Sequence, residues 1–384
     1  MSEGNRAGTP PRRGRRILKG LMVVGAGLVV LGFLGLCVAY FMSDNDCGSP
    51  AVAAVRSPMQ AIRYCGYGSP EVLGLTLLEK PVPTDEQVLI KVRAASVNPL
   101  DWHYMRGTPY LMRLGVGLRK PKVTRLGVDF SGTVEAVGAK VTKFKPGDEV
   151  FGGRFGAFAE YIVARQDGAV TLKPANITFE QAASVPIAAV TALQSLRDRG
   201  RLQPGQKVLI NGASGGVGTF AVQIAKSYGA EVTGVCSGRN VEMVKSLGAD
   251  HVVDYTQQDF AKTDERYDLI LDNVPNHTLA EYRHIMKEKG IYLQIGGGGP
   301  HDGNWIGPFG RVINAWVVSH FISQDMAMFL ADMNQDDLAV LAELMAAGKV
   351  TPVIDRTYTL RETSAAIAYL EEGHARGKVV ITMQ

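Results

Sequence analysis

The most regular hydrophobic pattern in the chain lies between residues 207 and 236. Residues 207–211 form a short apolar run that is typical of a buried parallel strand. Residues 212–218 contain too many glycines for the interior of a helix or strand. Apolar residues then recur at helical spacing from Val217 to Tyr228, and residues 231–236 have the pattern of a second strand. The pattern predicts a strand–turn–helix–strand unit.

Shorter patterns on either side of this unit predict two different kinds of region. Before it, strand-like segments alternate with glycine- and proline-containing turns, as in an all-β region. After it, buried strands alternate with helical segments, as in an α/β region. The further strands are predicted at 88–92, 132–137, 158–163, 251–255, 267–274, 290–295 and 377–383. We therefore expect an α/β protein with a β domain at 59–180, completed by 349–384, and an α/β domain at 181–348.

A stretch of 22 residues without a charge, Leu21 to Met42, precedes these domains. A helix of this length spans about 33 Å, against roughly 30 Å of hydrocarbon in a bilayer. Six Lys or Arg precede it within residues 1–19, and Asp44 and Asp46 follow it, which favours a cytoplasmic N-terminus. We predict a basic tail (1–20), a single-pass transmembrane helix (21–42) in contact with the lipid bilayer, and a linker (43–58).

Two alternatives to this topology stay open. A cleaved export signal is one, because Ala51-Val52-Ala53 resembles a cleavage site and Arg15-Arg16 resembles a twin-arginine signal. The side of the membrane is the other, because the charge asymmetry sends the region after the helix out of the cytosol, whereas the helix can also insert against this asymmetry.

Charge and cysteine usage exclude some classes of function. The formal net charge is +4, of which residues 1–19 contribute +5, so the rest of the chain lacks the basic footprint of a nucleic-acid-binding protein. The four cysteines, Cys37, Cys47, Cys65 and Cys236, form no CxxC pair and have no metal-ligand spacing. We therefore expect neither a disulfide framework nor a structural zinc site.

The glycine turn itself indicates a dinucleotide site. Glycines let the backbone approach a pyrophosphate, whose charge then lies among the free N–H groups at a helix N-terminus. The turn has the form AxGxxG between a strand and a helix, which is the setting that this motif requires. The expected cofactor contacts in the turn are Ala213, Ser214, Gly215, Gly216, Val217 and Gly218.

The end of the following strand indicates which dinucleotide binds. NAD-binding folds carry an acidic residue about 20 residues after the glycines, where it holds the ribose 2′-hydroxyl. No acid is present in this neighbourhood, whereas Ser237 and Arg239 are. A guanidinium suits a 2′-phosphate, so we expect NADPH, and a solvated surface arginine is the alternative interpretation.

Several motifs in a fixed order make the chain resemble a known family. They are AASVNPLD at 94–101, GVDFSG at 127–132, PGDEV at 146–150, GAFAEY at 156–161 and NGASGGVG at 211–218. With these motifs, the chain from Met59 to Gln384 resembles a medium-chain dehydrogenase/reductase, most of all its zinc-free, zeta-crystallin-like quinone oxidoreductase branch. The resemblance implies a GroES-like β domain packed on a Rossmann domain, with the active site between them.

The chain departs from the zinc-dependent members of that family at the metal ligands. Asn98 stands where they have a ligand cysteine, and Gly127-Val128-Asp129 replaces their Gly-His-Glu. A catalytic zinc needs three protein ligands, which an amide and a valine cannot supply, so we expect no metal. Hydrogen-bond donors must then stabilise the negative charge of the transition state, which suits quinones and α,β-unsaturated carbonyls.

The resemblance also implies the residues of the site. Asn98 and Tyr104 would donate to the acceptor oxygen, and Thr191 would orient the nicotinamide carboxamide. The alternatives are a loop-shaping role for Asn98, ordinary packing for Tyr104, and a proton relay through Asp101 and His103. Further cofactor contacts are expected at Tyr255, Asn273, Val274, Gly296 and Gly297, and at Gly377 and Lys378, which would close over the phosphates.

These expectations together predict a zinc-independent, NADPH-dependent oxidoreductase that reduces quinones or enones by hydride transfer. An NAD(P)-dependent alcohol or aldehyde dehydrogenase of the same family is one alternative, and a non-catalytic nucleotide-binding membrane protein is another. The apolar segment that contains Trp305 and Trp316 is expected to be buried or to form a homodimer contact, with a lipid surface as the alternative.

Overall fold

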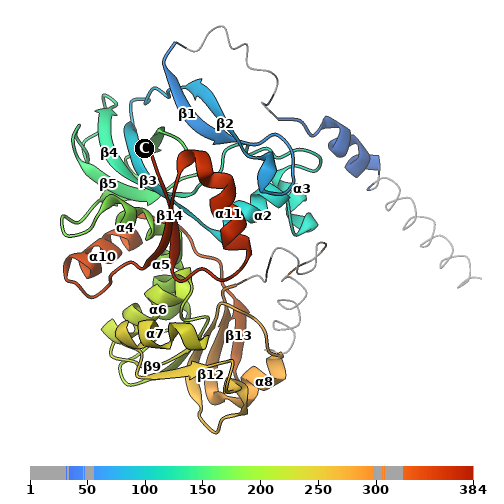
Figure 1. The fold of residues 1–384 in the computed structure, drawn as a ribbon, viewed down its shortest axis with the longest axis vertical. Helices are drawn as coiled ribbons and strands as arrows, with labels where there is room; N and C mark the ends of the chain where they lie inside the picture. The colour runs from blue at the N-terminus through green and yellow to red at the C-terminus, as the bar shows by residue number, and fades with distance from the viewer. Residues whose placement is uncertain are drawn as a thin grey trace, which may run out of the picture.

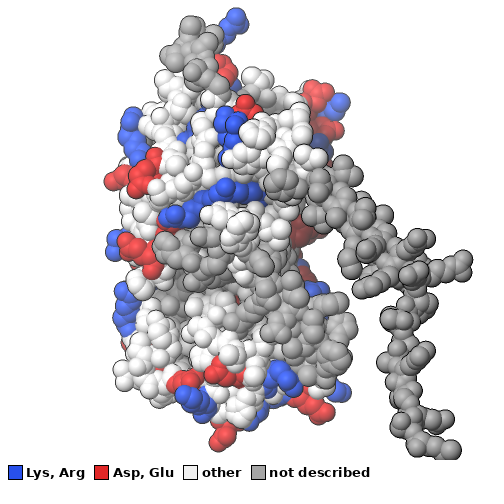
Figure 2. Space-filling view, turned by 90° about the vertical axis from the view of Figure 1, so that its right-hand side faces the viewer, with Lys and Arg blue, Asp and Glu red and all other residues white. Residues whose placement is uncertain are grey.

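Two large β-sheets, one in each lobe of the molecule, organise the fold (Figure 1). In this computed structural model the described residues are 32, 34–45, 47, 56–296, 299, 305, 307 and 323–383. The GroES-like and Rossmann-type architecture that the sequence predicts is present. On the face shown in Figure 2, Lys and Arg side chains are interspersed with Asp and Glu, unlike the one-signed patch of a nucleic-acid-binding protein.

The first lobe holds a seven-stranded sheet with β3 near its centre. The neighbour order is β14-β15-β3-β4-β5-β7, and β6 also pairs with β3. Val379 of β15 lies opposite Val97 of β3, so the start of the last strand lies beside the end of β3. The strands are β3 (Gln87–Val97), β4 (Asp129–Val137), β5 (Glu149–Gly153), β6 (Tyr161–Arg165), β7 (Val170–Leu172), β14 (Ile354–Thr359) and β15 (Lys378–Thr382).

The second lobe holds a six-stranded sheet in the order β10-β9-β8-β11-β12-β13, in which every pairing is parallel. Continuous apolar runs form its central strands because helices cover both faces of such a sheet. Its strands are β8 (Lys207–Asn211), β9 (Glu231–Cys236), β10 (His251–Asp254), β11 (Tyr267–Asp272), β12 (Met286–Gln294) and β13 (Asp325–Met328). Its helices are α6 (Gly216–Ser227), α7 (Val241–Ser246) and α8 (Leu279–His284), whereas α10 (Gln335–Ala346) packs against β7 of the first lobe and against α5.

Helix α5 (Pro186–Gln194) joins the two lobes. Eight of its nine residues are buried, as its apolar sequence requires, because a helix that is apolar all round must be covered on all sides. It packs against α6 of the second lobe and against β4 and β5 of the first. A change at the start of α5 therefore affects both lobes.

Strands β1 and β2, which form a two-stranded sheet of their own, and further helices cover the first lobe. Helices α2 and α11 lie side by side (Figure 1), and Arg106 joins them through two bonds to Glu371, one of them 2.7 Å long. These elements are β1 (Pro58–Arg63), β2 (Gly74–Glu79), α2 (Pro99–Arg106), α3 (Arg113–Val116), α4 (Phe179–Ala183) and α11 (Thr363–Glu371). Single helical turns lie at η2 (Pro70–Val72), η3 (Tyr110–Met112), η4 (Ser195–Arg199), η5 (Gly238–Asn240), η6 (Phe260–Lys262) and η7 (Leu360–Glu362).

Two predictions from the sequence differ from the structure. The strand expected at 158–163 begins only at Tyr161, because the preceding backbone turns to donate to Gly127 and Leu126. The expectation of no disulfide is wrong, because Cys47 and Cys65 are bonded, with their Cα atoms 5.6 Å apart. Their spacing carries no motif, and the pair forms because the chain before β1 folds back onto the end of that strand.

The predicted transmembrane helix lies largely outside the described residues, as does the basic tail. Residues 34–42, the described end of the segment, are helical. Within the described ranges, no helix has both the length and the apolar character needed to cross a membrane. Most of the apolar segment around Trp316 is likewise outside the described residues.

Candidate active site

The glycine turn lies at the carboxyl end of β8 and leads directly into α6. Gly212 has φ +75°, in the left-handed region that favours glycine. A Cβ atom on Gly218 would lie 2.2 Å from the carbonyl oxygen of Gly212, so the turn can close only without a side chain there. Gly215 precedes α6 and contributes no side-chain cap. The first N–H groups of α6 are therefore left for a ligand, as in anion-binding helix N-termini.

Asn240 connects this turn to the end of β9, a role that the sequence did not reveal. Its side-chain nitrogen donates to Ser214 Oγ and to Ser237 Oγ, both at 3.1 Å. Its Oδ1 is buried and has no hydrogen-bond partner among the described residues. A buried acceptor without a hydrogen bond is unusual in a folded protein, and a hydroxyl group of a bound ligand can donate to it. The sequence gives no signal for this role, because it depends on the contact between Asn240 and Ser214, which lie 26 residues apart in the chain.

Arg239, the predicted 2′-phosphate ligand, follows Ser237 on the same turn after β9. Its Nη2 donates to the carbonyl oxygen of His374 at 2.9 Å, and the rest of the side chain is exposed. The structure thus brings Ser237 and Arg239 to one end of the glycine turn. The guanidinium keeps further N–H donors for an anion.

The other end of the turn meets the ends of β11 and β12. Asn273 donates to the carbonyl oxygen of Asn211 from both its backbone (3.2 Å) and its side chain (2.8 Å). Its Oδ1 is a second buried acceptor without a partner in the described residues. Val274 lies against Gly212, where a Cβ atom would lie 2.9 Å from Val274 Cγ2, and Gly296 lies against the backbone of Asn273. The structure therefore brings these predicted residues together.

Three further predicted contacts have different surroundings. Gly377 touches the glycine turn, because its N–H donates to Ser214 O at 2.9 Å and it forms a bridge with Gly215. Tyr255 follows β10 and is exposed, with its backbone bonded to Cys236. Gly297 lies outside the described residues. The glycine cradle, the uncapped helix and the two unpartnered oxygens together fit a dinucleotide.

Beside the turn, in the first lobe, lies a group of polar side chains that are each at most 3% exposed. It forms where the end of β3 pairs with the start of β4 and where β15 begins, because these three strands meet at this point. Only some of its members can be assigned from the sequence, since nothing in a sequence shows that these positions converge. We call this group the buried cluster, and its members are Ser96, Asn98, Asp101, Asp129 and Lys378.

Asn98 uses its whole side-chain amide within the protein. Its Nδ2 donates to Asp129 Oδ2 at 2.9 Å and to the carbonyl oxygen of Ser96 at 3.3 Å, while its Oδ1 accepts from Lys378 Nζ. The sequence-based role of Asn98 as a donor to substrate stays a prediction. To donate to substrate, Asn98 would have to give up one of these two hydrogen bonds. The longer bond, to Ser96 O, would be the first to be replaced.

Burial shifts the protonation of the cluster. Asp101 accepts from the backbone N–H groups of Asn98 and Gly127, both at 2.8 Å. Burial nevertheless raises the pKa of Asp101 to about 7. Burial also raises the pKa of Asp129 and lowers that of Lys378, and the attraction between these two opposes both changes. The cluster therefore holds one compensated ion pair and one carboxyl that titrates near neutral pH.

Tyr104 of α2 offers a donor that the protein does not use. Its ring lies 4.9 Å from that of Phe155, centroid to centroid. Its hydroxyl has no hydrogen-bond partner in the part of the chain that the structure describes. Burial raises the pKa of Tyr104, so the phenol keeps its proton at neutral pH.

Thr191 and His103 are already bonded to the backbone. Thr191 Oγ1 donates to Ile187 O at 2.6 Å within α5, which leaves the oxygen lone pairs for a donor from a ligand. His103 Nδ1 lies 2.7 Å from Thr108 O, and its ring stacks on Trp102. Burial lowers the pKa of His103, so the imidazole is neutral at pH 7.

The positions of the family's metal ligands carry Asn98, Val128 and Asp129 here. Within the described ranges, no group of three or more His, Cys, Asp or Glu side chains could hold a metal ion. The sequence-based expectation about zinc rests on the identity of these three residues.

Comparison with known proteins identifies the family. Residues 84–174 match the alcohol dehydrogenase GroES-like domain, and residues 247–381 match the zinc-binding dehydrogenase domain. The chain is 36% identical over 369 residues to "NAD(P)H oxidoreductase RTN4IP1, mitochondrial" of Mus musculus, covering 88% of this chain and 92% of that protein. The chain belongs to the medium-chain dehydrogenase/reductase family. It is an oxidoreductase of the quinone oxidoreductase-like group of that family.

Other medium-chain dehydrogenase/reductase proteins agree in sequence and in fold. "2-methylene-furan-3-one reductase" of Solanum lycopersicum is 34% identical, covering 85% of this chain and 80% of that protein. The solved structure of the quinone oxidoreductase from Coxiella burnetii superposes with a TM-score of 0.74 at 32% identity, covering 85% of this chain and all of that one. The family's name for the 247–381 domain mentions zinc, whereas the ligand positions of this member do not supply zinc ligands.

Proposed function

We propose that this medium-chain dehydrogenase/reductase reduces quinones or α,β-unsaturated carbonyls with NADPH and without zinc. The observation that carries the proposal is the hydroxyl of Tyr104, a donor without a partner among the described residues, together with Val128 at a position where a metal-dependent relative has an imidazole. Hydrogen-bond donors of this kind stabilise a charge that conjugation already spreads. The relatives named as a quinone oxidoreductase and as a furanone reductase support the same class of acceptor.

The proposed roles in cofactor binding follow from the geometry of the turn. The N–H groups at the start of α6 receive the pyrophosphate, and Ser237 with Arg239 receives the 2′-phosphate. The unpartnered oxygens of Asn240 and Asn273 accept hydroxyl or amide hydrogens of the bound nucleotide. A bound NADPH supplies the hydride.

The proposed chemistry assigns the acceptor oxygen to Tyr104. Reduction of an enone adds a hydride at the β-carbon and a proton at the α-carbon, and reduction of a quinone adds a hydride and a proton to give the hydroquinone. In both, negative charge develops on the carbonyl oxygen, and the Tyr104 hydroxyl donates a hydrogen bond to it. The raised pKa of Tyr104 keeps that hydrogen in place, so the proton that completes the reaction comes from solvent.

The test is the oxidation of NADPH by the purified protein in the presence of a quinone and, separately, an enal. We expect both to be reduced, with NADH giving slower oxidation. NADPH binding without oxidation in either assay would favour the non-catalytic alternative. Faster turnover with a simple alcohol and NADP than with either acceptor would favour the dehydrogenase alternative.

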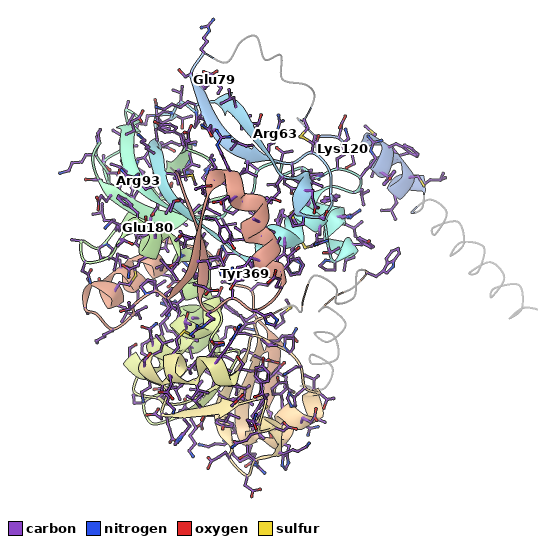
Figure 3. The ribbon with its side chains drawn as sticks, in the orientation of Figure 1. Arg63, Glu79, Arg93, Lys120, Glu180 and Tyr369 are labelled. Atoms are coloured by element: carbon purple, nitrogen blue, oxygen red, sulfur yellow. A yellow bond between two sulfur atoms is a disulfide. The ribbon has the colours of Figure 1, made fainter. Side chains whose placement is uncertain are left out.

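We also propose that residues 21–42 attach the protein to a lipid bilayer. In support, the described helical end, residues 34–42, exposes apolar side chains, with Phe41 73% and Met42 78% exposed. The residues after it are held on the first lobe: Asp44 pairs with Lys120 at 2.6 Å, beside α3 (Figure 3). The Cys47–Cys65 disulfide adds a covalent link and is typical of an oxidising compartment, which favours the non-cytoplasmic side.

Alkaline carbonate extraction tests the attachment. We expect the full chain to stay with the membrane pellet, and a chain that starts at Ser57 to be released. Release of the full chain, or a mature protein that begins near Ala54, would contradict the anchor.

A further inference from the structure

Lys378 is a buried cation at the junction of the two lobes, and only 3% of it is exposed. Its aliphatic stem passes over the glycine turn, since a Cβ atom on Gly216 would lie 3.1 Å from Lys378 Cδ. Its ammonium ends among three acceptors: Asn98 Oδ1, Val97 O at 3.4 Å and Asp129 Oδ2 at 3.5 Å. An ammonium has three N–H donors, so all three have acceptors inside the protein.

The position of the ammonium determines how the Asn98 amide is oriented. Lysine can only donate, so the oxygen of the amide must face Lys378. The nitrogen must then face the opposite way, toward Asp129 Oδ2 and the carbonyl oxygen of Ser96. A neutral side chain at position 378 would remove one of the two constraints on this orientation and leave only the acceptors on the nitrogen side, Asp129 Oδ2 and Ser96 O.

Asp129 extends the same constraint to α5. Its Oδ2 accepts from Ser96 Oγ (3.0 Å) and from Asn98, while its Oδ1 accepts from the backbone N–H of Ile187 at 3.0 Å. Ile187 lies in the first turn of α5, the helix that carries Thr191. Lys378 is the cation that compensates this buried carboxylate. Removing its charge would leave the buried Asp129 carboxylate with no compensating charge, which is a costly arrangement.

We propose that Lys378 is a positioning residue for the reduction, acting through Asn98 and Asp129. Its ammonium holds the Asn98 amide in one orientation and, through Asp129, fixes the start of α5. It therefore supports turnover and contributes little to the affinity for NADPH, because its three N–H groups already have acceptors within the protein. This role replaces the contact with the cofactor phosphates that the sequence predicts. This inference rests on the proposed function.

The substitution Lys378→Met tests the two roles against each other, because it keeps the length of the side chain and removes the charge. We expect kcat to fall about 10- to 100-fold, since small displacements of site groups have effects of this size. The Kd of NADPH, measured by fluorescence titration, should stay within about threefold. Lys349→Met, at an exposed position, is the matched control and should change neither quantity.

Two results would overturn the proposal. An NADPH Kd at least ten times weaker with kcat unchanged would make Lys378 a phosphate ligand. Unchanged kcat and unchanged Kd would leave it without a role in the site.

A second variant covers the case in which Lys378→Met does not fold. The double variant Lys378→Met/Asp129→Asn removes both buried charges, so its melting temperature should exceed that of either single variant. It should bind NADPH as the unsubstituted protein does and still turn over more slowly, and full turnover would contradict the proposal. If the unsubstituted protein reduces no quinone or enone, the proposed function fails, and the melting temperatures alone then test the Lys378–Asp129 pairing.

Discussion

Two polar regions meet at the junction of the lobes, and they are built in opposite ways. The glycine turn and its surroundings consist of backbone groups and side-chain oxygens left without partners, such as Asn240 Oδ1 and Asn273 Oδ1. In the buried cluster, side chains satisfy one another: Asn98 uses its whole amide and Asp129 accepts from four donors. The turn has capacity for a ligand, whereas the cluster has its bonding capacity filled.

This contrast indicates that the two regions have different functions. Unsatisfied polar groups in a folded protein lose free energy that a ligand restores when it binds, so the turn is suited to holding a cofactor. A satisfied low-dielectric network keeps its members in one arrangement, so the cluster is suited to holding geometry. Tyr104, with its free hydroxyl on α2, is the exception on the cluster side and the side chain we assign to the acceptor.

The largest expected effect comes from filling the turn. In Gly218→Ala the new Cβ atom would lie 2.2 Å from Gly212 O, so the turn must shift away from its ligand-binding shape. We expect the affinity for NADPH to fall by at least about 100-fold in a fluorescence titration. Gly115→Ala, at a position with open space around it, is the control. Wild-type affinity in Gly218→Ala would show that the turn does not cradle the nucleotide.

Tyr104→Phe tests the role of the Tyr104 hydroxyl, the donor that the buried cluster leaves unused. It removes one hydroxyl that has no partner among the described residues, so folding should be unaffected. We expect kcat to fall about 10²- to 10³-fold, the usual effect of removing a donor to a developing oxyanion, with the Kd of NADPH unchanged. Tyr161→Phe, at a strand position in the first lobe, is the control. Turnover within a few-fold of normal would remove Tyr104 from the mechanism.

Arg239→Ala tests whether Arg239 binds the 2′-phosphate of NADPH. A charge-assisted hydrogen bond contributes about 1.5–3 kcal/mol, so the preference for NADPH over NADH should fall about ten- to a hundredfold. The affinity for NADH should hardly change, because it lacks the phosphate. Arg361→Ala, another exposed arginine, serves as the control. Equal binding of both cofactors by the unsubstituted protein would be enough to reject this role.

The smallest expected effect concerns the pH dependence of stability in the cluster. The pKa of Asp101 is raised to about 7, so between roughly pH 4 and 7 the folded protein holds a proton that the unfolded chain releases. This contribution to stability is full below about pH 4 and is lost as the pH rises through 7. Between pH 5 and 8 the melting temperature of Asp101→Asn should therefore fall less than that of the unsubstituted protein. The difference between the two falls should be a few degrees. Parallel melting curves for the two proteins would contradict the shifted pKa.

The two regions also differ in how far the sequence predicts them. The turn, α6 and the flanking strands β8 and β9 are local, so apolar spacing and glycine density are sufficient to place them. Ser237, Arg239 and Asn273 follow, because the ends of parallel strands meet at one edge of the sheet.

The buried cluster could not be predicted in the same way. It depends on Val97 facing Val379 across the sheet, a pairing between positions far apart in the chain. The sequence therefore places Lys378 near the turn but does not show where its ammonium ends. The same limit explains the missed disulfide and the missed role of Asn240, each of which depends on a contact rather than on a pattern.

The comparison of one enone with its saturated ketone, in a single NADPH-oxidation assay after dialysis against a chelator, tests the central claim most directly. The two compounds differ only in conjugation, which a site of hydrogen-bond donors requires and a Lewis-acidic metal does not. We predict that the enone is reduced at a rate unaffected by the chelator, and that the saturated ketone reacts at least about 100 times more slowly. Equal rates for the two compounds, or loss of enone reduction after chelation that added zinc restores, would contradict the account.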